Sequence, residues 1–190
     1  MSSTGYSRKK RPDLVRRTLL DEAARIAVEH GLAGVTVQAV ADAAGVTKGG
    51  LFHHFPSKQA LIQAMFRDAL DKLGAEIEGH IAEDEDPHGR FTRAYVEVLL
   101  VSERFGVGSP FDALSVAAMA EPALRPLWTD WIDDRLACHR DTDDDPMLEI
   151  VRFAADGAWL TYLGHRQTCT AVRTLRDRLI ELTRRTGKPG

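Results

Sequence analysis

The sequence is poor in cysteine and has no long apolar run, and both gaps exclude classes of protein. Only two of the 190 residues are cysteine, Cys138 and Cys169, without CxxC spacing. Neither a disulfide scaffold nor a zinc site is therefore indicated, and we expect both cysteines to be buried packing residues. No run approaches the roughly 18 apolar residues of a membrane span. The first residues also lack the apolar stretch of a secretory signal, so we expect a cytoplasmic protein.

Strand patterns are missing as well, because Val, Ile, Phe and Tyr rarely alternate with polar residues. Apolar residues recur instead at steps of three and four, as at Leu19, Ala23 and Ile26. Six helix starts carry an N-cap candidate, namely Thr36, Thr47, Ser57, Asp86, Ser109 and Asp145, and a proline follows the last three. The sequence thus predicts an all-α protein of about nine helices, with an acidic loop at 141–145. Their approximate ranges are 12–30, 36–44, 47–54, 58–83, 87–105, 110–120, 122–140, 146–165 and 168–186.

Charge is unevenly distributed along the chain. Residues 1–58 carry nine Lys or Arg and five Asp or Glu, whereas the remaining residues have a net charge of −7. A basic N-terminal part suggests a surface that faces a polyanion, although chance and a solubilising tail explain the charge equally well. The basic arm at 7–11 could add phosphate contacts or remain a solvated tail. Arg16 and Arg17 are expected to be solvent-facing charges.

Residues 35–58 combine two short predicted helices with a tight glycine turn, which is a helix-turn-helix pattern. Ala41 is small where the helices would cross, and Gly45 has the backbone freedom that the turn needs. Leu51 would anchor the second helix, and Phe55 is also expected in the core. By itself this pattern would fit any pair of packed helices.

A longer stretch of sequence makes this helix-turn-helix pattern more specific. The run from Leu19 to Leu61 resembles the N-terminal DNA-binding domain of the tetracycline-repressor (TetR) family of transcriptional regulators, most specifically in GVTKGGLFHHFPSK at 45–58. The resemblance implies a helix-turn-helix domain at 1–57, with 1–11 a flexible basic arm. It also implies a helical effector-binding and dimerisation domain at 58–190.

The resemblance and the outward positions of the second short helix together predict the DNA contacts. Two departures from the family stand out: Phe52 lacks the hydroxyl of the usual tyrosine, and Gly50 replaces a side chain. Gly49 and Gly50 each cost a helix about 1 kcal/mol relative to alanine. They either allow close backbone approach to DNA or are merely tolerated. The predicted set is Thr36, Thr47, Lys48, Gly49, Gly50, Phe52, His53, His54 and Lys58.

The rest of the chain is rich in aromatic and apolar residues, as an apolar ligand cavity between helices would be, although core packing explains any single one. Asp156 interrupts an apolar run and is either a polar group for the ligand or a satisfied surface carboxylate; Asp112 is another candidate polar group. By resemblance, the effector lies among the middle helices. The predicted contacts are Tyr95, Leu99, Phe111, Leu114, Trp128, Trp131, Asp156 and Trp159.

The last two predicted helices carry more apolar rows than a lone pair can bury. By resemblance they pair with their copies in a second subunit, and the homodimer would address a pseudo-palindromic operator. The predicted interface consists of Leu148, Val151, Ala155, Ala158, Tyr162, Val172, Leu175 and Leu179.

These features predict a dimeric repressor that a small apolar or aromatic effector releases from its DNA operator. No cofactor, metal or membrane partner is expected. A helical enzyme or carrier is the first alternative, but HExxH, GxSxG and phosphate-loop motifs are absent, so we expect no enzyme. A DNA-binding protein without an effector is the second.

Overall fold

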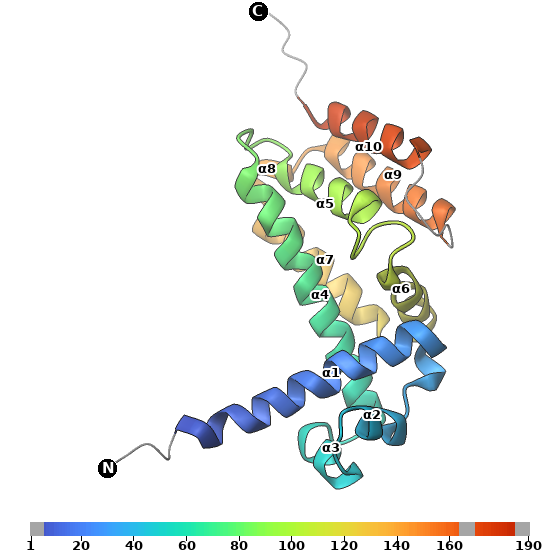
Figure 1. Cartoon of the computed structure of the whole chain (residues 1–190). Coiled ribbons are helices and arrows are strands. Elements are labelled where there is room, and N and C mark those ends of the chain that lie inside the picture. Colours follow the sequence, from blue (N-terminus) through green and yellow to red (C-terminus); the bar gives the residue numbers. More distant parts are fainter. Residues whose placement is uncertain (1–5, 164–169, 185–190) are drawn as a thin grey trace, which may run out of the picture. The chain divides into compact units, whose positions relative to one another are not determined.

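Every secondary-structure element in the described part of the protein is an α-helix (Figure 1). The computed structural model describes residues 6–163 and 170–184, and no strand occurs within them. This confirms the all-α prediction. Its helices are α1 (Tyr6–Gly34), α2 (Val37–Ala43), α3 (Lys48–His54), α4 (Lys58–Glu83), α5 (Arg90–Val101), α6 (Pro110–Ala120), α7 (Arg125–Cys138), α8 (Arg140–Asp143), α9 (Pro146–Tyr162) and α10 (Thr170–Thr183).

Local capping explains the starts of α2, α3, α4 and α9. The side-chain oxygens of Thr36, Thr47, Ser57 and Asp145 each accept a hydrogen bond from a backbone N–H two or three residues later, at 2.8–3.1 Å. These bonds satisfy N–H groups that have no partner inside the helix. Gly31 has a φ of 69°, which interrupts α1 at the predicted position.

Three features differ from the sequence predictions. The first helix already begins at Tyr6, because its early Lys and Arg residues favour helix; the flexibility of the arm stays a prediction. The short helix α8 lies partly in the segment expected to be an acidic loop. Cys138 is exposed, so its predicted packing role was wrong, and Cys169 lies outside the described residues.

The start of α5 also differs from its prediction at Asp86-Pro87. The helix begins at Arg90, after Gly89 adopts a left-handed φ of 73°. Asp86 accepts a hydrogen bond from the backbone of His88 and so forms a turn instead of a cap. The first turn of α5 is capped from outside by Asp143, whose carboxylate accepts from the backbone N–H groups two and three positions after Gly89.

The chain forms two compact units. The first comprises residues up to Ala69 together with Ala113–Arg125, and the second comprises Leu70–Asp112 and the residues from Pro126 onward. Within the first unit, α2 packs on α1 and α3; within the second, α5, α9 and α10 pack on one another. The domain boundary predicted after Ser57 stays a prediction. No helix of the described residues is long and apolar enough to cross a membrane.

Candidate functional site

The turn between α2 and α3 has the geometry that the sequence predicted. Gly45 adopts a φ of 66°, and the backbone N–H of Val46 donates to the carbonyl of Ala41 at 2.9 Å. Ala41 and Leu51 are almost fully buried. The small alanine and the left-handed glycine therefore bring α3 against α2, and Leu51 fixes its inner side.

The outer side of α3 is open to solvent. Lys48, Gly49 and His53 are exposed, and Phe52 retains 46% of its accessible surface. Two residues subtend about 200° in a helix, so Gly49 lies nearly opposite the buried Leu51. No acidic residue occurs in α3. This face offers a cation, an imidazole and an aromatic ring to a partner without a competing negative charge on the same helix.

The other predicted DNA contacts also belong to the first unit. The hydroxyl oxygens of Thr36 and Thr47 accept their capping bonds, which leaves both hydroxyl hydrogens available to donate. Lys58 is exposed at the start of α4, and Gly50 is half-buried. His54 is also half-buried, and its ring meets that of His53 edge-on, with 5.6 Å between their centroids.

Two side-chain contacts join α1 to other parts of the first unit. Phe55 is buried, as predicted, and the guanidinium of Arg16 lies 5.2 Å from its ring centroid. Arg17 donates from Nη1 and Nη2 to both carboxylate oxygens of Asp68, the second bond measuring 2.7 Å, and also bonds to Asp21. These carboxylates raise the pKa of Arg17. The prediction that Arg17 is a plain solvent-facing charge was therefore wrong, because its partner on α4 is distant in sequence.

The predicted effector residues are mostly interior. Tyr95, Leu99, Phe111, Leu114 and Trp159 are buried. Leu114 belongs to the first unit, whereas the other four belong to the second. The rings of Trp128 and Trp131 on α7 are partly exposed and stack on each other, with 5.4 Å between centroids.

Two carboxylates are tied to aromatic side chains inside the second unit. The hydroxyl of Tyr95 donates to Oδ1 of Asp156 at 2.5 Å, and the indole N–H of Trp159 donates to Oδ1 of Asp112 at 2.7 Å. Asp112 also accepts from the backbone of Gly108 at 2.7 Å. Burial raises the pKa of both carboxyl groups and of Tyr95. Asp156 is thus a half-buried, bonded group and not a surface carboxylate.

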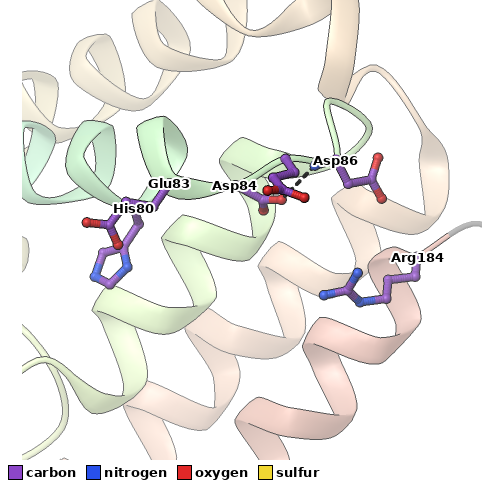
Figure 2. A pocket seen from close by; sticks show the side chains of 6 residues that line it. His80, Glu83, Asp84, Asp86 and Arg184 are labelled. Carbon is purple, nitrogen blue, oxygen red and sulfur yellow. Dashed lines mark hydrogen bonds between the residues drawn. The ribbon is translucent and has the colours of Figure 1, made fainter.

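A hollow of about 620 Å³ lies elsewhere in the second unit, where α4 ends (Figure 2). Its walls are mostly acidic and contain none of the predicted effector residues. Asp84 bonds to the buried guanidinium of Arg93 at 2.6 Å. Burial raises the pKa of Asp84, but this bond and the backbone of Asp86 outweigh it, so the pKa is lowered. The lining residues are His80, Glu83, Asp84, Glu85, Asp86 and Arg184. In the described residues no group of acidic, His or Cys side chains could hold a metal.

Most of the predicted dimer residues are used inside the chain. Leu148, Val151, Ala155, Ala158, Val172 and Leu179 are buried, while Tyr162 and Leu175 keep partial exposure. The apolar side chains that remain exposed are not the predicted ones. They are Met147, Ile150, Phe153 and Leu160 on α9 and Leu182 on α10. Helix α9 thus has apolar side chains on both its inner and its outer face. The dimer role of the predicted residues stays a prediction.

Comparison with known proteins identifies two similar regions. A family model described as "Bacterial regulatory proteins, tetR family" matches residues 19–65, which contain α2 and α3. A second, described as "Tetracyclin repressor-like, C-terminal domain", matches residues 89–184, just over half of the chain. The two matches together cover the exposed helix α3 and the aromatic interior of the second unit.

Individual relatives are similar over different lengths. The HTH-type transcriptional repressor KstR2 of Rhodococcus jostii is 35% identical over 102 residues, which are 53% of this chain and 48% of that repressor. The chain thus spans about half the length of that relative. KstR2 of Mycolicibacterium smegmatis is 24% identical over 77% of both proteins. The solved structure of the multidrug binding protein EbrR complexed with malachite green has a TM-score of 0.69 and 27% identity, and the match covers 89% of this chain and 98% of EbrR.

Proposed function

This chain belongs to the tetracycline-repressor family of bacterial regulatory proteins, and from that membership we propose that it represses transcription by binding a DNA operator. The observation that carries the proposal is the outer face of α3, which is exposed, free of acidic residues and held from behind by Leu51. A short helix of this kind fits the major groove of duplex DNA. Lys48 and His53 would supply contacts to phosphates or base edges.

We further propose that two copies bind together through the outer face of α9. Ile150, Phe153 and Leu160 are each more than half exposed, and Gly157 lies among them. A Cβ at Gly157 would meet nothing within 4 Å in the chain itself, so the glycine leaves room for a neighbouring helix. Two recognition helices would then contact the two halves of a pseudo-palindromic operator.

A small effector would bind in the aromatic interior of the second unit. The bonded pairs Tyr95–Asp156 and Trp159–Asp112 offer polar groups among apolar walls, the usual composition of a ligand site. The EbrR structures support this proposal, because that similar protein is a multidrug binding protein crystallised with malachite green. An effector that binds only the DNA-free arrangement would lower the affinity for the operator, and operator DNA would lower the affinity for the effector.

A catalytic role is not proposed, since the curated relatives are transcriptional repressors.

DNA selection tests the proposal directly. The purified protein is used to enrich sequences from a random DNA library, and binding to the enriched site is measured by fluorescence anisotropy at several salt concentrations. We expect a palindromic site and an affinity that falls with salt. Failure to enrich any sequence would contradict the repressor function. A thermal-shift screen of small aromatic compounds, followed by anisotropy in their presence, tests the effector separately.

A further inference from the structure

Gly49 occupies the centre of the outer face of α3. It lies opposite the buried Leu51, and the exposed Phe52 and His53 follow it by three and four residues, which places them beside it on the helix surface. The most outward point of the proposed recognition helix therefore carries no side chain. Bare backbone is exposed there, with the Phe52 ring next to it.

The fold of the chain itself gives no reason for glycine at this position. The φ angle of Gly49 is not positive, so its backbone conformation does not require glycine. A Cβ atom built on Gly49 would meet only the Thr47 hydroxyl oxygen, at 3.8 Å. Alanine would therefore fit without strain. Glycine is also among the least favourable residues within a helix, so it weakens α3. Gly50 is less informative, because a Cβ there would contact Val46 at 3.6 Å and the Thr47 hydroxyl at 3.4 Å.

The exposed ring of Phe52 is the one apolar side chain on this face of α3. Its ring is 46% exposed on a helix whose other outward side chains are polar, and it has no hydroxyl to bond a phosphate. The apolar group that the major groove offers to such a ring is the 5-methyl group of thymine. The Phe52 ring would contact this methyl group from one side, while the exposed backbone of Gly49 lies against the floor of the groove.

We propose that Gly49 determines DNA specificity: its bare backbone packs against the methyl group of a thymine, and the Phe52 ring contacts the same group. This inference rests on the function proposed above, because it places α3 in the major groove. A methyl group on residue 49 would occupy the space of the thymine methyl. The glycine thus selects thymine at one position in each half-site, at the expense of helix stability.

The test compares Gly49→Ala with a matched control, Gly79→Ala. Gly79 is exposed inside α4, and a Cβ there would meet nothing within 4 Å. We expect both variants to unfold at higher urea concentration than the unmodified protein. On the selected operator, Gly49→Ala should bind at least tenfold more weakly, whereas Gly79→Ala should bind as the unmodified protein does. A Gly49→Ala variant that is less stable, or that binds equally well, overturns the inference.

A second arm tests the thymine methyl group. Each thymine of the half-site is replaced in turn by deoxyuridine, which removes only the 5-methyl group. At one position we expect the substitution to weaken the unmodified protein severalfold and to strengthen Gly49→Ala, because the clash between the two methyl groups disappears. Uniform effects at every position overturn the inference. Specific operator binding that is unaffected by Gly49→Ala overturns this inference alone, whereas the absence of specific binding overturns the proposed function.

Discussion

At the scale of single residues, Lys48 is the exposed cation of the proposed DNA-binding face. We expect Lys48→Ala to weaken operator binding by about 1–3 kcal/mol if it contacts a base, and to make binding less sensitive to salt if it contacts a phosphate. Anisotropy titrations over a salt series distinguish the two contacts. Arg173→Ala removes the same charge from the exposed side of α10 and should bind normally. Unchanged affinity and salt dependence in Lys48→Ala would show that α3 is misplaced in the proposal.

Asp156 makes a second residue-scale prediction, about stability and pH. Burial raises its pKa above the ordinary value of 3.8, so the folded state holds the proton more tightly than the unfolded state. The charged carboxylate therefore reduces stability once the pH has risen through this range. Asp156→Asn keeps an oxygen that can accept from the Tyr95 hydroxyl, but it carries no charge.

We expect Asp156→Asn to be more stable than the unmodified protein at pH 7, with the difference shrinking as the pH falls toward 4. Urea unfolding at a series of pH values measures this difference. A difference that is the same at all pH values, or a less stable variant at pH 7, would contradict the assignment of a burial-raised pKa.

Sequence analysis could find residues whose roles are local. Thr47 caps its own helix and Gly45 adopts its left-handed turn, because both depend on neighbours within a few positions. The sequence also marked Asp156 as a polar interruption in an apolar run. It could not supply the partner Tyr95, which lies 61 positions away. Periodicity shows which face of a helix is buried but carries no information about what covers it.

At the scale of the helix, a predicted helix start is correct where the capping residue is local and wrong where the capping residue is distant in sequence. Helix α9 begins where predicted because Asp145 caps it directly. Helix α5 does not begin at Asp86, because its capping group, Asp143, lies more than 50 positions along the chain. The Asp143 carboxylate is buried and also accepts from the Thr92 hydroxyl at 2.7 Å.

The distant cap should matter for stability. Asp143→Asn replaces one acceptor oxygen with an amino group that faces the N–H donors of α5. We expect a loss of about 1–3 kcal/mol in the free energy of unfolding, the usual penalty for buried donors without acceptors. Asp141→Asn, an exposed change in the same short helix α8, serves as the control and should unfold normally. Equal stability of the two variants would show that Asp143 does not hold the start of α5.

At the scale of the whole molecule, helix α9 shows why a subunit interface is harder to predict than a core. The sequence indicated that the last two helices have more apolar rows than they can bury, and the described residues agree. Ala155 and Val151 lie in the interior of the second unit, whereas Ile150 and Phe153 are exposed. Both rows are apolar and recur at steps of three and four residues, so the sequence could not distinguish the row that packs within the chain.

The exposed apolar row of α9 predicts which substitution separates the two subunits. Phe153 is 66% exposed, so Phe153→Glu should leave the fold of each chain intact while it places a charge in the proposed α9 interface. We expect a monomer by sedimentation equilibrium and a large loss of operator affinity, since each chain would then hold one half-site alone. Met119→Glu, at an exposed apolar residue of α6, should remain dimeric. If Phe153→Glu stays dimeric and binds the operator normally, the subunits associate through a surface other than the outer face of α9.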